Sequence, residues 1–182
     1  MRKRAGALFI AVLTAASLAV GVAGTAGAST AAKKSKKILC AGKTKSKAVA
    51  AIEEAYDHFL NGALYPDAVD KAPYIEYLSG TKENAELLAA FEASSAANAE
   101  AAATTGVEVD EVTCTGKKTA DATFTLVIGG TRAEGLAPPG AAILEGKTWK
   151  VTGLTLCNLQ ALGDPTVLET GPCSDIILEE EA

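Results

Sequence analysis

Apolar and polar residues alternate most strictly over residues 120–128, directly after Thr119. A repeat of two residues is typical of a β-strand that buries one of its faces. The residues that fall on the expected buried face are Ala120, Ala122, Phe124, Leu126 and Ile128. Asp121 falls on the opposite face, where we expect its carboxylate to meet solvent. The pattern therefore predicts a strand whose inner face is entirely apolar.

Three further segments have strand patterns. These segments are residues 107–112, 141–144 and 147–156. The alternation of the first slips once near Asp110, as a β-bulge would cause, and the last is predicted to bend at Gly153. Residues 116–118 are predicted as a turn, and residues 129–140 as a loop rich in Gly and Pro. Together with the first strand, these segments indicate a curved, four-stranded antiparallel sheet.

The first half of the chain has helical periodicity instead. The apolar residues that recur every three or four positions are Val49, Ile52, Tyr56, Phe59 and Leu60. They predict a helix from Ser46 to about Asn61 that packs one stripe on the sheet. Residues 66–71 are predicted as a short helical turn, and a longer helix is predicted from an N-cap at Thr81 to a stop at Gly106. The fold class is therefore α+β, with N-terminal helices packed on the curved sheet.

Residues 1–28 are expected to be a secretory signal peptide. Basic residues at positions 2–4 come before an apolar run of small residues at 5–24, and residues 26–28 form an A-x-A cleavage site. Because the run is short and diluted by Gly, Ala, Ser and Thr, we favour cleavage over an uncleaved membrane anchor. After cleavage we expect no membrane span and an extracytoplasmic protein, either secreted or held in the cell envelope.

The mature chain is acidic. Removal of the signal takes away three of the 17 Lys and Arg and none of the 22 Asp and Glu, which leaves 14 basic against 22 acidic residues, a net charge of −8. Nucleic acid is therefore not an expected partner, since phosphate binding needs a clustered positive face. The remaining 154 residues suit one domain with its own core.

Residues 29–46 are small, polar and basic, and we interpret them as a solvated, lysine-rich linker. Its first lysines are Lys33, Lys34, Lys36 and Lys37. An alternative is that this region makes a weak electrostatic contact with anionic polymers of the cell envelope.

Four cysteines follow the signal: Cys40, Cys114, Cys157 and Cys173. An even number in an exported protein favours two disulfides, for which three pairings are open. A zinc site is disfavoured because the chain has no C-x-x-C pair and its one histidine is His58. No metal and no cofactor is predicted.

The order of elements resembles that of the nuclear transport factor 2-like superfamily. The stretches that carry the resemblance are AYDHFLNG at 55–62, VEVDEVTCTGKKTADATFTL at 107–126 and AAILEGKTWKVTGLTLCNL at 141–159. The last is also similar to exported actinobacterial proteins of the secreted low-molecular-weight antigen family. The resemblance implies a cone-shaped domain over residues 47–160. Residues 161–182 have no counterpart in it and are predicted to be an irregular acidic tail.

The resemblance also narrows the disulfide pairing. In such a sheet Cys114 and Cys157 would lie at opposite ends, too far apart to be joined. Of the two schemes that remain, we prefer Cys157 with Cys173, which holds the tail locally, and Cys40 with Cys114.

Enzymes of this superfamily place Asp, His or Tyr inside the cone as acid and base. The resemblance makes Tyr56, Asp57 and His58 the candidates, but we expect His58 at the edge of the buried stripe or outside it, so no residue is assigned as catalytic. The aromatic residues that could line an apolar pocket are Tyr56, Phe59, Phe91, Phe124 and Trp149. The alternative that we prefer is that these rings fill the core.

We therefore expect an exported, non-catalytic protein that binds a partner or a small apolar ligand in the cell envelope or the medium. The alternative is a polyketide-cyclase-like or isomerase-like enzyme that uses Asp57, His58 or Tyr56 in the cone pocket. A histidine and a carboxylate that converge inside an open apolar cavity would favour the enzyme. A third interpretation makes the domain a folded spacer for the lysine-rich linker.

Overall fold

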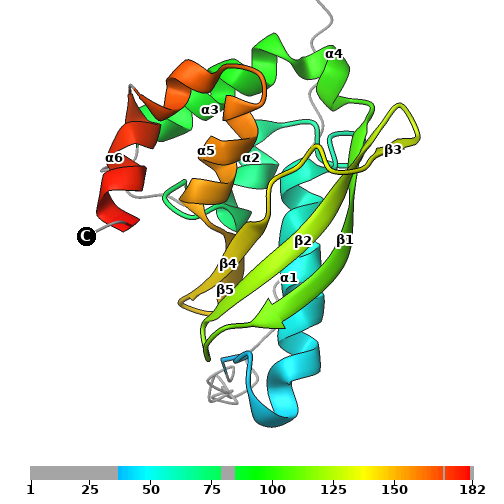
Figure 1. The fold of residues 1–182 in the computed structure, drawn as a ribbon, viewed down its shortest axis with the longest axis vertical. Helices are drawn as coiled ribbons and strands as arrows, with labels where there is room; N and C mark the ends of the chain where they lie inside the picture. Colours follow the sequence, from blue (N-terminus) through cyan, green and yellow to red (C-terminus); the bar gives the residue numbers. More distant parts are fainter. Residues whose placement is uncertain (1–36, 79–84, 170, 181–182) are drawn as a thin grey trace, which may run out of the picture. The chain divides into compact units, whose positions relative to one another are not determined.

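The computed structural model describes residues 37–78, 85–169 and 171–180. They lie within one compact unit, residues 35–182. The helices are α1 (Lys45–Leu60), α2 (Ala68–Lys71), α3 (Ala85–Ala97), α4 (Ala99–Ala102), α5 (Gly153–Ala161) and α6 (Pro172–Glu180). Short 3₁₀ helices are η1 (Gly42–Thr44), η2 (Ala72–Tyr74) and η4 (Pro165–Leu168). The strands are β1 (Thr105–Cys114), β2 (Thr119–Ile128), β3 (Thr131–Ala133), β4 (Gly140–Glu145) and β5 (Thr148–Val151). The protein is α+β, as predicted (Figure 1).

Within the described residues, the strands form one antiparallel sheet around β2. β1 pairs with β2 over its whole length, from Thr105 opposite Ile128 to Cys114 opposite Ala120. On its other side, β2 pairs with β4 through its first residues and with β3 through its last, and β5 continues the sheet beyond β4. The register of β1 shifts after Val109, which confirms the predicted bulge.

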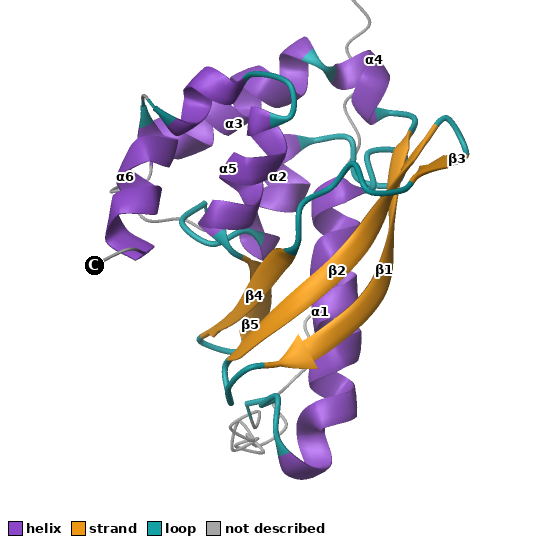
Figure 2. Cartoon of the chain, in the orientation of Figure 1, coloured by secondary structure: helices purple, strands orange, loops and turns teal. Residues whose placement is uncertain are grey.

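The core lies between α1 and the inner face of the curled sheet (Figure 2). The buried residues of α1 follow a helical stripe and are Ala48, Ile52, Ala55, Tyr56 and Phe59. Opposite them the sheet presents Ala120, Ala122 and Ala142, each 1% exposed. These small side chains let the helix approach the sheet closely, and the larger rings fill the space beside them. Ile128 departs from the prediction because it is 44% exposed, at the end of β2 beside the glycine turn.

The predicted strand over residues 147–156 is wrong in its second half. β5 ends at Val151, and the chain turns into α5 at Gly153. Thr152 caps the helix, since its hydroxyl accepts a hydrogen bond from the Thr155 amide at 3.3 Å. The buried carboxylate of Glu76 accepts a second bond from the Gly153 amide at 3.1 Å. Two of the free amides of the first turn thus have acceptors, and the chain continues as a helix instead of a bent strand.

The predicted loop at residues 129–140 contains a strand, β3, so the sheet of the described residues has five strands instead of four. Gly129 and Gly130 have positive φ and make the tight turn that folds β3 back on β2. The expected N-cap at Thr81 lies outside the described residues. Gly106 does not end a helix, because α4 ends at Ala102 and β1 has begun by Thr105.

The expectation of an irregular tail after residue 160 is also wrong. Pro172 opens α6, where Pro is favourable because the first helical amides need no partner within the helix. Cys173 and Ile176 of α6 are buried and belong to the core. The tail therefore packs on the fold as a helix.

Both disulfides implied by the resemblance are present. Cys40 joins Cys114 with a Cα–Cα distance of 5.7 Å, and Cys157 joins Cys173 at 5.6 Å. The first holds the end of the predicted linker against the sheet, where the Trp149 indole Nε1 also donates to the Ile38 carbonyl at 2.9 Å. No helix among the described residues is both long and apolar enough to cross a membrane.

Candidate functional site

Tyr56 is fully buried at the centre of the core. Its hydroxyl donates to the carbonyl oxygen of Ala141 at 3.2 Å, and its ring centroid lies 5.0 Å from that of Phe124. Burial raises the pKa of Tyr56 well above its ordinary value of 10, a hydrogen bond with Thr155 opposes this, and the charge of Asp121 adds to it. The group is therefore held as a neutral phenol, which is far from the poise of a catalytic base near pH 7.

This pKa shift has a measurable consequence at high pH. The pKa of Tyr56 is higher in the folded than in the unfolded chain. The contribution of the neutral phenol to the free energy of unfolding is therefore complete below about pH 10 and is lost as the pH rises above it. We expect the free energy of unfolding of the native protein to fall more steeply between pH 9 and pH 11 than that of Tyr56→Phe. At pH 7 the variant is expected to lose about 1 kcal/mol with its hydrogen bond. Urea unfolding of both proteins at pH 7, 9 and 11 measures these free energies. An equal decrease for the two proteins between pH 9 and pH 11 would contradict a raised pKa for Tyr56.

The side chains of Asp57 and His58 contact neither Tyr56 nor each other in the interactions that the structure shows, and each has its own partners. The Asp57 carboxylate accepts a hydrogen bond from the Asn61 side-chain amide at 2.9 Å. The His58 ring is half-buried and stacks between Tyr65 and Tyr74, with centroid distances of 3.8 and 3.9 Å. Its Nδ1 atom has no hydrogen-bond partner among the described residues. The three sequence-predicted candidates therefore do not form an acid–base pair.

The aromatic residues proposed as a pocket lining are all buried. Phe59 faces Phe91 across α1 and α3, with ring centroids 6.5 Å apart. Trp149 is 2% exposed, and its indole N–H donates to the Ile38 carbonyl. The rings pack on one another and on the neighbouring elements, and their lining of a ligand pocket stays a prediction.

One small hollow lies on the opposite, outer face of the sheet and has a volume of about 60 Å³. The residues that line it are Glu111, Thr113, Asp121, Ala122, Thr123 and Pro139. Its two carboxylates face solvent, as predicted for Asp121, and none of the five aromatic residues borders it. Among the described residues, no three His, Cys, Asp or Glu side chains gather in a way that could hold a metal ion.

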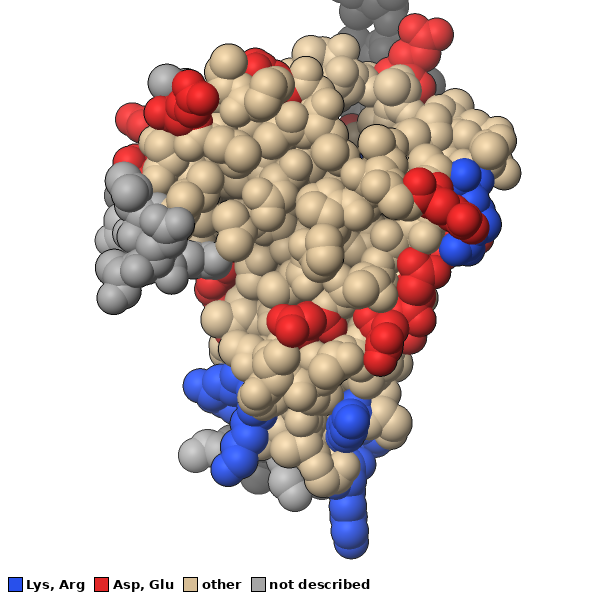
Figure 3. Space-filling model, in the orientation of Figure 1, with Lys and Arg blue, Asp and Glu red and all other residues tan. Residues whose placement is uncertain are grey.

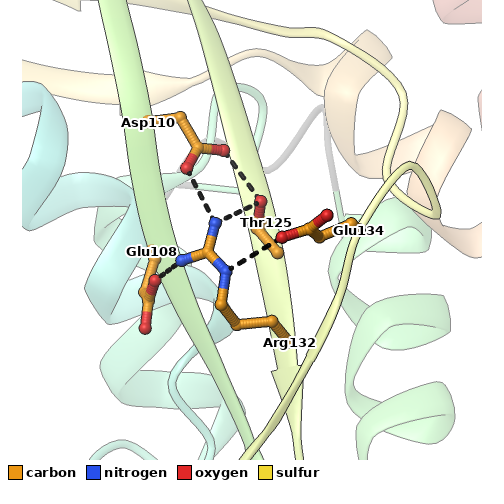
Figure 4. A network of polar contacts seen from close by, with 5 residues as sticks. All are labelled: Glu108, Asp110, Thr125, Arg132 and Glu134. Atoms are coloured by element: carbon orange, nitrogen blue, oxygen red, sulfur yellow. Dashed lines mark hydrogen bonds and ion pairs between the residues drawn. The ribbon is translucent and has the colours of Figure 1, made fainter.

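The outer face also carries a charge network that the sequence pattern did not predict (Figure 4). Arg132 of β3 reaches across β2 and pairs with Glu108, with Asp110 at 3.3 Å and with Glu134 at 3.6 Å. Thr125 donates to Asp110 at 2.8 Å. The alternation of β1 was the available signal for the acidic side, because Glu108 and Asp110 are two residues apart and so lie on one face of the strand. Arg132 could not be placed without β3. Since these side chains are about half exposed, the network contributes little to stability.

The fold and these sites define a class: a small, disulfide-bonded α+β protein whose titratable candidates lie apart and whose core includes buried aromatic rings. Within that class, the chain belongs to the family described as low molecular weight antigen MTB12, C-terminal domain, whose family model matches residues 45–166. The match runs from the start of α1 into η4. No curated protein and no solved structure matches the chain. The resemblance to the antigen family is confirmed, and the wider nuclear transport factor 2-like assignment stays a prediction.

Proposed function

We propose that the protein is exported and acts as a non-catalytic binding protein that presents its folded surface to a partner in the cell envelope or the medium. The observation that carries the proposal is the separation of Tyr56, Asp57 and His58. Tyr56 points into the core, Asp57 accepts a hydrogen bond from Asn61 at the end of α1, and His58 stacks between two tyrosines. Acid–base catalysis requires such groups within hydrogen-bond reach of one substrate.

Two further features support this proposal. One disulfide joins the segment before α1 to the sheet and the other joins α6 to α5, as suits a small domain in an oxidising compartment. Family membership with an antigen class fits export, which we infer together with cleavage of the signal after residue 28. A small apolar ligand is the less favoured form of the proposal, because the rings that would line its pocket are occupied by packing against one another.

Native mass spectrometry of the protein collected from the medium and the envelope tests export and ligand content together. We expect a chain that starts at Ser29, carries both disulfides and has no bound small molecule. A chain that retains residues 1–28 and free thiols would overturn export. A stoichiometric apolar adduct would overturn the surface-binding form and restore the ligand pocket.

A probe of the core adds an independent measurement. We expect ligand-observed NMR to detect no saturable binding of benzene or indole to the native protein, because a filled core has no room for a ring. Phe124→Ala is the positive control: removal of a buried ring leaves an apolar cavity, and such cavities bind small aromatic molecules. Saturable binding by the native protein at the level of the variant would contradict a filled core.

A further inference from the structure

Exposed lysines gather at one end of the folded unit, which we call the lysine pole. Its members are Lys37, Lys43, Lys45, Lys47, Lys117, Lys118 and Lys147. They come from three segments far apart in the sequence: the stretch that leads into α1 together with the first turn of α1, the β1–β2 turn and the β4–β5 turn. In Figure 3, basic side chains lie at the end where Figure 1 places these turns and the start of α1, and the other basic group in view, at the right-hand edge, lies among acidic side chains.

The backbone holds the three segments together. The Cys40 amide donates to the Lys117 carbonyl at 3.0 Å, beside the disulfide from Cys40 to Cys114. The Leu144 amide donates to the Lys118 carbonyl at 2.8 Å, which joins the β1–β2 turn to the hairpin that carries Lys147. The pole is thus a fixed feature of the fold and not a chance approach of mobile side chains.

The remaining basic residues of the described part are neutralised or hidden. Arg132 pairs with three carboxylates, Lys150 pairs with Glu145, and Lys71 is 6% exposed. None of the seven pole lysines forms an ion pair within the described part of the chain. Among the residues that the structure describes, the exposed positive charge outside ion pairs therefore lies at one end of the folded unit, which orients this acidic protein in the field of an anionic partner.

The start of α1 gives a second, independent observation. A helix favours acidic residues in its first turn, where the amide dipoles are positive. The first turn of α1 holds Lys45 and Lys47 and no acidic residue. Thr44 at the N-cap position does not cap the helix, because its hydroxyl donates instead to the carbonyls of Leu39 and Ala41. These lysines therefore lie at the positive end of the helix dipole, where no acidic side chain of the first turn offsets their charge.

We propose that the lysine pole is the docking surface for an extended polyanion, a chain that carries negative charge at each repeat. This proposal rests on the proposed function, since it specifies the partner that the exported surface binds. Lysine heads are mobile point charges that suit repeated anions better than one rigid ligand. Within the described residues, the pole offers no large apolar side chain to enter a lipid bilayer: the exposed ones are Leu64, Val69, Ile128, Leu136 and Leu162, all on other segments.

Fluorescence anisotropy with labelled long-chain polyphosphate tests the proposal on the oxidised chain of residues 29–182. The first variant is Lys117→Gln/Lys118→Gln/Lys147→Gln, which removes positive charge from the two turns and leaves the residues before α1 unchanged. We expect binding to weaken about 10- to 100-fold at low salt, and the slope of log K against log salt to fall by about three, about one for each lysine.

A second variant separates the pole from net charge. It adds Glu86→Gln/Glu92→Gln/Glu100→Gln, three exposed acids on α3 and α4, and so restores the net charge of the native protein. We expect binding to stay weak. Recovery of native affinity would overturn the proposal in favour of a bulk charge effect, as would native affinity in the first variant or no binding by the native protein.

Vesicles of phosphatidylglycerol and phosphatidylcholine form the last arm. Tighter binding to vesicles than to polyphosphate would overturn the polymer as occupant in favour of a membrane surface, and weaker binding supports the polymer. The proposed function is tested separately, by native mass spectrometry of the protein in the medium and the envelope. Its failure is distinguishable from these outcomes, because polyphosphate binding is measured on the purified chain.

Discussion

Replacement of Cys40 and Cys114 by alanine is expected to lower the free energy of unfolding by about 4 kcal/mol at 25 °C. The disulfide joins residues 74 positions apart, so its loss frees a long loop in the unfolded chain. In the folded chain it anchors the segment that supplies the Ile38 carbonyl to Trp149. Alanine is preferred to serine because Cys40 is buried and an unpaired hydroxyl there would add its own cost. Equilibrium unfolding in guanidinium chloride measures the loss.

The second disulfide provides a matched control. Cys157 and Cys173 are 16 positions apart, and the chain-entropy account gives about 3 kcal/mol for a loop of that size. We therefore expect Cys157→Ala/Cys173→Ala to cost less than Cys40→Ala/Cys114→Ala. The opposite order would show that packing of α6 on α5, and not loop closure, sets the contribution of these bonds.

Gly62→Ala is expected to destabilise the protein by about 3 kcal/mol. A methyl group at this position would lie 2.0 Å from the carbonyl oxygen of Ala102. The neighbour is backbone and cannot rotate away. Its displacement would also strain the hydrogen bond from the Gly62 amide to the Thr105 carbonyl, 2.9 Å long. The end of α1 and the junction between α4 and β1 therefore approach each other in a way that only glycine allows.

Gly163→Ala is the control for this substitution. Its added methyl group would meet the Gln160 carbonyl at 3.7 Å, an ordinary contact, and the backbone there is not in the left-handed region. We expect a change within about 0.5 kcal/mol. Urea unfolding of both variants measures the two changes in the free energy of unfolding. Similar changes for the two would mean that the close approach of Gly62 to Ala102 is not maintained in solution.

The sequence predicted those elements in which the spacing of the apolar residues indicates which face is buried. β2 alternates strictly, and its inner alanines and Phe124 are buried as expected. α1 buries the predicted Ile52, Tyr56 and Phe59. The bulge near Asp110 was visible because a strand that slips once moves its apolar residues out of phase. In each case, residues close together in the sequence were enough to predict the element and its buried face.

The candidate site was predicted less well. The disulfide pairing came from the resemblance and is confirmed. The stacking of His58 between Tyr65 and Tyr74 was not foreseen, because those tyrosines follow α1 in segments with no clear period. The Arg132 network was missed with β3, a strand of three residues that is too short for alternation to show.

By itself, the sequence determined the class of the fold, the central strand, the first helix and which face of each meets the core, because period and polarity act locally. Only the tertiary structure decided that the chain leaves β5 for α5 after Thr152. The carboxylate that accepts from Gly153 belongs to Glu76, 77 residues earlier, and no local pattern contains it. The lysine pole has the same origin: its lysines are scattered along the sequence, and hydrogen bonds between distant segments bring them to one end.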